Sequence, residues 1–123
     1  MNNRYEGVVG EETAVEYLQA KGYKILERNY ANKVGEIDII AQDHDYIVFV
    51  EVKRRLDDRY GRALEAVTPA KIAKIVRCAE WYLTAHRQYN ADVRFDVVTV
   101  GASGVEHLVN AFTRQDAGRR NHW

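Results

Sequence analysis

The sequence contains few of the residues and runs that mark several large classes of protein. Its single cysteine, Cys78, excludes an internal disulfide framework and a cysteine-rich zinc site. Its only proline is Pro69. No stretch approaches the roughly 20 apolar residues that span a bilayer, and residues 1–6 lack the apolar run of a signal peptide. We therefore expect a cytoplasmic protein that has no membrane partner.

A net charge is also absent, because 18 Lys and Arg balance 18 Asp and Glu. This balance argues against a protein that coats nucleic acid non-specifically. The charges are nevertheless unevenly placed. Residues 1–50 hold five basic and nine acidic side chains, a net of −4, and residues 51–123 hold thirteen and nine, a net of +4. This asymmetry fits a basic face for a polyanion beside carboxylates for a metal, and it fits equally well charges scattered over a solvated surface.

Two segments carry helical patterns. Residues 8–21 have apolar side chains at helical spacing, and Gly22 follows them, which is typical of a helix C-terminus. Thr68 and Pro69 predict the N-cap and first residue of a second helix, which extends to about His86. Its predicted buried stripe consists of Ile72, Ile75, Val76, Ala79 and Leu83.

Five further segments read as strands. They cover residues 23–31, 35–41, 46–53, 93–100 and 105–112. The order α-β-β-β-α-β-β predicts an α/β fold with a mixed central β-sheet flanked by helices. We expect one domain over residues 1–113, since a chain of this length can bury a core, and a polar, flexible tail over residues 114–123.

The hairpin predicted from the second and third strands brings acidic residues together. If residues 44–45 form a two-residue turn, Asp38 lies opposite Glu51, and Glu36 lies opposite Lys53. All four side chains then share one face, because side chains alternate along a strand.

Two acids and a lysine at the end of a buried strand are unfavourable unless something uses them. A divalent cation such as Mg²⁺ prefers carboxylate oxygens as ligands, which makes Asp38 and Glu51 candidate metal ligands. A structural ion pair of Lys53 with Glu36 or Glu51 explains the same pattern. The pattern by itself does not separate these two interpretations.

The first helix offers another acid. Glu11 falls on the same stripe as Ala14 and Leu18, so it faces the sheet and is a candidate additional ligand. Alternatively, it is a glutamate near a helix N-terminus, where the macrodipole favours negative charge.

Basic residues follow the third strand. Arg54, Arg55, Arg59 and Arg62 surround Tyr60, which suits phosphate contacts and base stacking, although a solvated loop has the same composition.

Other polar residues receive no functional role. We expect Arg94 and Asp96 on opposite faces of their strand and interpret Asp96 as structural. The histidines show no metal-ligand spacing, and Cys78 is expected in the core.

Several motifs resemble, in order, the YraN family of bacterial endonuclease-like proteins. They are Gly10-Glu11-x-x-Ala14-x-x-Tyr17-Leu18, Gly22-Tyr23, Gly35-Glu36-Ile37-Asp38-Ile39-Ile40-Ala41, Phe49-Val50-Glu51-Val52-Lys53-x-Arg55, Arg94-Phe95-Asp96-Val97-Val98 and Asn110-Ala111-Phe112. The resemblance covers the chain up to about Phe112. That family is similar to archaeal Holliday junction resolvases and belongs among the PD-(D/E)xK nucleases. Ile37 departs from the proline in the superfamily's name.

The resemblance implies a restriction-endonuclease-like fold and a metal-dependent endonuclease that is selective for branched or processed DNA. Mg²⁺ or Mn²⁺ would be held by Asp38, Glu51, the carbonyl of Val52 and Glu11. Lys53 would stabilise the charge that develops during hydrolysis, and Lys71 would reach the scissile phosphate. A homodimer is a further expectation, since resolvases cut two strands symmetrically.

Two alternatives remain at this stage. One is a nucleic-acid-binding protein that keeps the nuclease-like fold and has little or no activity. The other is a protein-interaction module in which the acidic cluster is only an ion-pair network. Metal-dependent cleavage separates the nuclease from both alternatives. Salt-dependent DNA binding separates the nucleic-acid-binding protein from the protein-interaction module.

Overall fold

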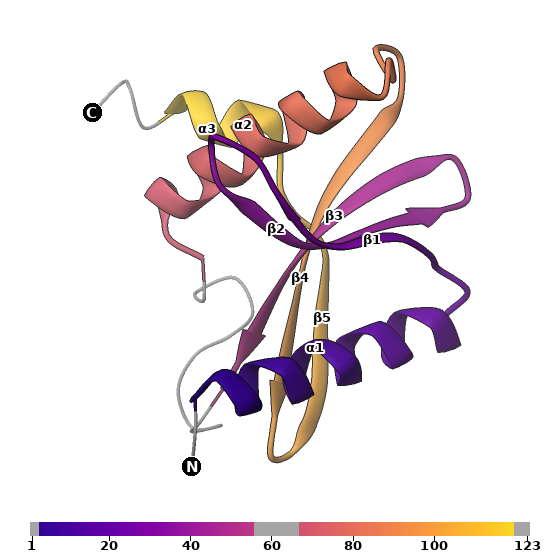
Figure 1. The fold of residues 1–123 in the computed structure, drawn as a ribbon, viewed down its shortest axis with the longest axis vertical. Helices are drawn as coiled ribbons and strands as arrows, with labels where there is room; N and C mark the ends of the chain where they lie inside the picture. Colours follow the sequence, from indigo (N-terminus) through magenta and orange to yellow (C-terminus); the bar gives the residue numbers. More distant parts are fainter. Residues whose placement is uncertain (1–2, 56–66, 120–123) are drawn as a thin grey trace.

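The protein folds into a five-stranded mixed sheet covered by helices on both faces (Figure 1). The structure is a computed structural model that describes residues 3–55 and 67–119. Its elements are α1 (Asn3–Ala20), β1 (Lys24–Ala31), β2 (Glu36–Asp43), β3 (Tyr46–Arg54), α2 (Pro69–Ala85), β4 (Asp92–Gly101), β5 (Gly104–Phe112) and α3 (Arg114–Arg119). The predicted α/β class and the order α-β-β-β-α-β-β are confirmed, and α3 is an addition.

The strands lie in the sheet in the order in which they follow one another in the chain, β1-β2-β3-β4-β5. Neighbouring strands are antiparallel except for β3 and β4, which are parallel. A parallel pair needs a long crossover, and the chain supplies it with the connection through α2. Strand β3 is central, and its residues Val48, Phe49 and Val50 are all buried, as a strand covered on both faces requires.

The helices divide the core into two layers (Figure 1). On one face, Ala14 and Leu18 of α1 pack against Ile39, Val48 and Val50. On the other face, α2 covers a cluster that includes Phe49 and Phe95, whose rings stack with centroids 5.5 Å apart. Each large apolar side chain buried in this way stabilises the fold by about 1.5–3 kcal/mol. Side chains of β3 therefore face α1 and α2 alternately.

Helix α2 begins as the sequence predicts. The Thr68 side chain accepts a hydrogen bond from the backbone N–H of Lys71 at 3.2 Å, and Pro69 occupies the first turn. Of the predicted stripe, Ile75, Val76, Ala79 and Leu83 are buried, while Ile72 is half-buried. Cys78 is buried in the same layer, as expected.

Two expectations about the ends of the chain are wrong. Helix α1 begins at Asn3 rather than at residue 8. Residues 114–119 form α3 instead of part of a flexible tail, because Asp116 Oδ2 accepts a hydrogen bond from the backbone N–H of Thr113 at 2.7 Å. Arg114 also pairs with Glu80 of α2 at 2.7 Å, and Ala117 packs against the α2 layer. Local capping and contact with a distant helix thus order this segment.

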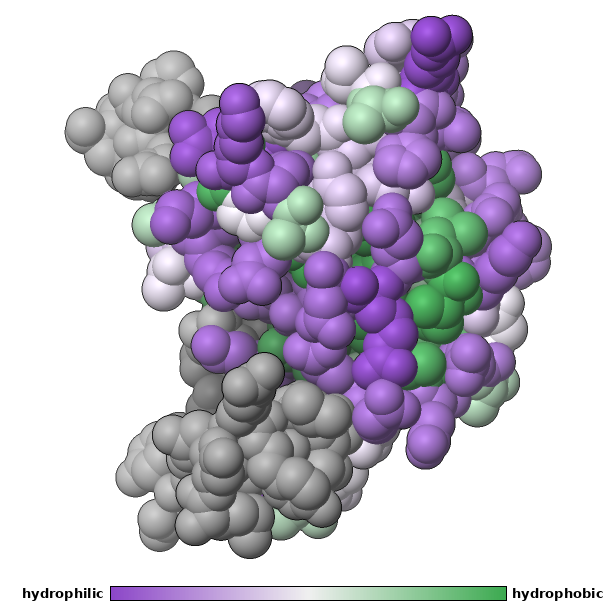
Figure 2. Space-filling model, viewed as in Figure 1, coloured by the Kyte–Doolittle hydropathy of each residue, from purple (hydrophilic) through white to green (hydrophobic). Residues whose placement is uncertain are grey.

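The face in view in Figure 2 is mainly hydrophilic, with hydrophobic residues gathered at one side of it. Within the described ranges, no helix has both the length and the apolar character needed to cross a bilayer.

The turn between β2 and β3 places His44 at a φ of 55°, a left-handed conformation that suits a two-residue connection between antiparallel strands.

Candidate functional site

The β2–β3 hairpin has the register that the sequence predicts. Asp43 pairs with Tyr46 across the two-residue turn, and the ladder continues to the pair Ile39–Val50. Continuing this register places Asp38 opposite Glu51, one step beyond the last pair. The ladder between β2 and β3 stops there, whereas β2 remains paired with β1 as far as Glu36.

Asp38 is anchored where this ladder ends. Its Oδ2 accepts a hydrogen bond from the backbone N–H of Val52 at 2.8 Å. The carboxylate therefore substitutes for a main-chain partner and is fixed beside β3. Side-chain alternation places Asp38 and Glu51 on the face of the sheet that α2 covers.

Glu51 is a buried acid, with 6% of its side chain exposed. Its Oε2 lies 3.1 Å from Nζ of Lys71, which comes from the first turns of α2. Burial, followed by the charge and hydrogen bonding of Asp38, raises the pKa of Glu51 to about 7 although Lys71 opposes the shift. Glu51 in turn raises the pKa of Lys71, so this lysine stays a cation at neutral pH.

Helix α1 brings a third acid towards the same end of the sheet. Burial and the negative charge of Asp38 raise the pKa of Glu11, while a hydrogen bond with Asn29 and the charge of Arg28 oppose the rise. The described residues nevertheless contain no group of three or more His, Cys, Asp or Glu side chains placed to hold one metal ion. Glu11 therefore stands beside the pair of Asp38 and Glu51 rather than within it.

The pair fits a hard divalent cation in charge and ligand type. Two carboxylates share a partly buried position, and one lysine, Lys71, compensates them. Mg²⁺ is commonly held by one or two carboxylates, with waters and substrate phosphates completing its coordination. The residues that could hold it are Asp38 and Glu51, with the backbone carbonyl of Val52 next in the chain and Glu11 nearby.

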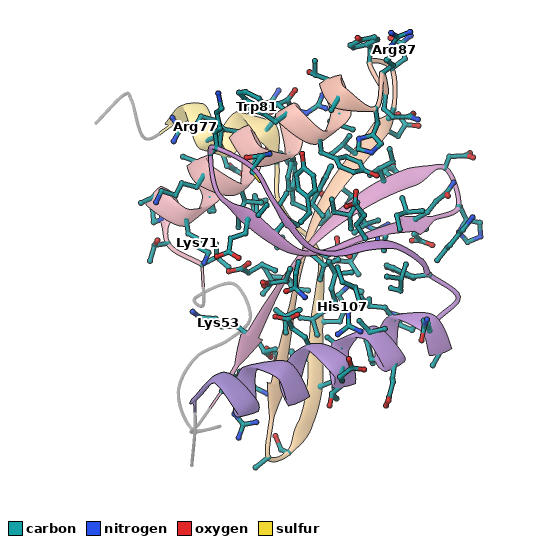
Figure 3. The ribbon with its side chains drawn as sticks, viewed as in Figure 1. Lys53, Lys71, Arg77, Trp81, Arg87 and His107 are labelled. Atoms are coloured by element: carbon teal, nitrogen blue, oxygen red, sulfur yellow. The ribbon has the colours of Figure 1, made fainter. Side chains whose placement is uncertain are left out.

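The other predicted residues of the strand lie at its open end. Lys53 and Glu36 are exposed, and it is Lys71 rather than Lys53 that pairs with Glu51. The ion pair at Glu51 therefore comes from α2 and not from Lys53, the partner considered as an alternative in the sequence, and spacing within the strand could not reveal this. Figure 3 shows Lys53 and Lys71 on the same side of the molecule.

Only part of the predicted basic segment can be placed. The backbone N–H of Arg55 donates to the carbonyl of Val100 at 2.8 Å, which extends the contact between β3 and β4. Its side chain is half-buried. Arg59 and Tyr60 lie outside the described residues, so their assignment to nucleic-acid binding stays a prediction.

Sequence reasoning missed a second polar network, on the α1 side of the sheet. The buried Asp96 carboxylate accepts hydrogen bonds from Arg94 Nε at 2.9 Å and from the backbone N–H of Asn110 at 3.0 Å, and lies 2.7 Å from His107 Nε2. Arg94 also donates to Asp43 at 2.9 Å. Burial raises the pKa of Asp96, but the hydrogen bonds from His107 and Arg94 outweigh it and hold the value below its usual range.

The expectation that Arg94 and Asp96 face opposite ways is wrong, since residues two apart in a strand share a face. His107, which received no functional role from its spacing, is a structural member of this network. Its side chain is 1% exposed, and its ring packs edge-on against Tyr17 at 5.5 Å. The one available signal was an acid within an otherwise apolar strand, which indicates a buried charge that needs partners.

With this geometry in view, comparison with known proteins assigns the chain to a family. A family model described as "Uncharacterised protein family UPF0102" matches residues 10–100. The chain belongs to the UPF0102 family. UPF0102 is the YraN family, so the resemblance seen in the sequence is confirmed. The matched region includes Glu11, Asp38, Glu51 and Lys71.

UPF0102 relatives from several bacteria match most of the chain. A protein of Syntrophomonas wolfei is 46% identical over 114 residues, covering 89% of this chain and 99% of its own. One of Clostridioides difficile is 46% identical and covers 91% and 100%. One of Vibrio campbellii is 45% identical and covers 85% and 83%. Among solved structures, a chain described as "Structure of EndoMS-dsDNA2 complex" is similar over 77% of this chain and 38% of its own, with a TM-score of 0.41 and 23% identity.

Proposed function

We propose that this UPF0102 protein is a metal-dependent endonuclease that hydrolyses phosphodiester bonds in branched or processed DNA. The observation that carries the proposal is the pairing of Asp38 and Glu51 at the end of the β2–β3 ladder. A structural role explains this pairing poorly, because burying two acids together destabilises the fold unless a cation compensates them.

The metal would be held by Asp38, Glu51 and the carbonyl of Val52, with Glu11 assisting through water. When bound, Mg²⁺ or Mn²⁺ supplies Lewis-acid polarisation of the phosphoryl group and lowers the pKa of a coordinated water. The hydrogen bond that the backbone N–H of Val52 donates to Asp38 fixes the carboxylate before any ligand arrives, so little reorganisation is needed.

The lysines would act on the phosphate. Lys71 keeps its proton and half of its side chain is exposed, so it can contact a non-bridging oxygen while it remains near Glu51. Lys53 is exposed at the end of β3 and would stabilise the negative charge that develops on the phosphoryl group. We assign both residues an electrostatic role.

The test is a cleavage assay with labelled single-stranded, duplex, flap and four-way-junction DNA, in Mg²⁺, in Mn²⁺ and in chelator. We expect metal-dependent cleavage by the wild type that is lost in Asp38→Asn and in Glu51→Gln. The matched control is Asp45→Asn, which makes the same change at the exposed turn of the same hairpin and should keep full activity.

The outcomes separate the functional classes. Cleavage that persists in Asp38→Asn would rule out this site. Salt-dependent DNA binding without cleavage on any substrate would favour a nucleic-acid-binding protein with a nuclease-like fold. If the protein neither bound nor cleaved any of these DNA substrates, the acids would be interpreted as an ion-pair network. Paired cuts in the junction would also support the homodimer.

A further inference from the structure

The outward face of α2 carries an exposed tryptophan. Trp81 has 49% of its surface exposed, although tryptophan is a residue that folding usually buries to a large degree. It lies ten residues beyond Lys71 on the same helix, which corresponds to about 15 Å along the helix axis. Figure 3 shows Lys71, Arg77 and Trp81 following α2 from the candidate site.

Two hollows border the Trp81 side chain. One, of about 530 Å³, lies between the β1–β2 connection and α2, and its lining includes Lys33, Arg77 and Trp81. The other, of about 480 Å³, is lined by Trp81 and its neighbours Glu80, Thr84 and Ala85. Volumes of this size accommodate a flat aromatic group such as a nucleobase.

Basic side chains line the first of these hollows and continue along α2. Lys33, Lys74 and Arg77 are exposed, and none of them forms an ion pair with any residue that the structure describes. Glu80, the acid in both linings, is already paired with Arg114 at 2.7 Å. Lys74, Arg77 and Trp81 follow at intervals of three and four residues, so they form one strip along the helix. An unneutralised basic strip around an exposed indole is complementary to a phosphate backbone with accessible bases.

We propose that this surface, the Trp81 patch (Lys33, Lys74, Arg77 and Trp81), binds a single-stranded segment of nucleic acid. The indole stacks on an unpaired base, and Arg77 and Lys33 contact the flanking phosphates. A paired base is already stacked within its duplex, so the patch selects an unpaired strand. The proposal rests on the proposed function in one respect: the bound strand is the arm that leaves the Asp38–Glu51 site. A few nucleotides of a single strand can follow the roughly 15 Å along α2 from Lys71, which contacts Glu51, to Trp81.

Binding is measured in chelator, so that no cleavage contributes. The probes are a labelled decathymidylate and a blunt duplex of the same length. In a Trp123→Phe background, Trp81 is the only tryptophan, and its emission should be quenched by the single strand. Fluorescence anisotropy should give an affinity for the single strand that is about tenfold weaker in Trp81→Ala and largely kept in Trp81→Phe.

Two further variants refine the test. Arg77→Gln should reduce the slope of log affinity against log salt by about 0.7, the value for one lost phosphate contact. Tyr89→Ala is the control, since Tyr89 is an even more exposed aromatic residue, at 69%, that lies outside the Trp81 patch, and its removal should change nothing.

An unchanged affinity in Trp81→Ala, an unquenched Trp81, or tighter binding of the duplex would overturn the proposal. Self-association that disappears in Trp81→Ala, without binding of the single strand, would identify the patch as a protein interface and also overturn it. Failure of the nuclease proposal is distinguishable, because single-strand binding through Trp81 without cleavage keeps this inference and removes the other.

Discussion

The surroundings of Glu51 disfavour the ionised form of its carboxyl group. Its side chain is almost fully buried, and Asp38 lies beside it, so both surroundings favour the protonated acid. Lys71 compensates only in part. Such destabilised groups are typical of functional sites, where the fold tolerates a local loss of stability for the sake of binding.

This conflict predicts how stability depends on pH in metal-free buffer. The folded-state pKa of Glu51 is about 7 and the ordinary value is 4.5, so the folded state binds more protons between these limits. Proton binding to Glu51 therefore stabilises the folded state fully below pH 4.5, and this stabilisation is lost as the pH rises through 7. The free energy of unfolding changes by roughly 3 kcal/mol over this range. Glu51→Gln should lack this decline, which urea unfolding at pH 4.5 and pH 8 can measure.

The matched control is Glu36→Gln, since Glu36 is an exposed acid on the neighbouring strand. It should show the same decline as the wild type. If Glu51→Gln lost stability over this range as steeply as Glu36→Gln, Glu51 would not be the titrating group.

At the scale of elements, α2 connects the fold to the candidate site. Its N-cap, Thr68, fixes the first turn through the backbone N–H of Lys71, and the side chain of Lys71 reaches Glu51. The same helix carries Trp81 on its outward face. The position at which α2 begins therefore determines which of its residues faces the carboxylates.

Thr68→Ala should lower the free energy of unfolding by about 1 kcal/mol, because it removes the hydrogen bond that satisfies the first turn. Thr68→Ser keeps the hydroxyl and should retain most of the stability. Thr84→Ala, an exposed position within α2, should be neutral or slightly stabilising, since alanine favours helix. Equal losses in Thr68→Ala and Thr68→Ser, measured by urea unfolding, would contradict the capping role.

Elements whose determinants are local could be predicted from the sequence. The two-residue turn at residues 44–45 fixed the register that brings Asp38 opposite Glu51, and Thr68 with Pro69 located the start of α2. The segment 114–119 was misjudged because part of its order comes from Arg114 contacting a distant helix. A polar segment has no apolar periodicity to reveal such a contact.

At the scale of the whole molecule, most of the contacts that sequence reasoning missed join different elements of the chain. Lys71 reaches Glu51 only through the crossover, and Arg94 reaches Asp43 across 51 positions. His107 and Asp96 meet because β5 pairs with β4. Spacing along one element carries no information about such pairs. The sequence therefore predicted which acids would converge but not which cations would accompany them.

Binding of Mg²⁺ should appear in the stability of the entire domain. A ligand that binds only the folded state, at ten times its dissociation constant, stabilises it by about 1.4 kcal/mol, which raises the Tm by roughly 5 °C. We expect this shift by calorimetry in the wild type and in Asp45→Asn, and none in Asp38→Asn. An equal rise in all three, or with sodium chloride of matched ionic strength, would indicate general screening instead of a site.

The consecutive order of the strands has a consequence for folding kinetics. Every antiparallel pair joins neighbours in the chain, so the hairpin of Asp38 and Glu51 closes over two residues at a small entropic cost. Lys71 arrives only once the crossover docks β4 beside β3. During folding the two acids therefore meet before their compensating cation does. At neutral pH, we expect repulsion between them to raise the barrier to an otherwise fast step, so that the residues proposed for catalysis also slow the assembly of the sheet.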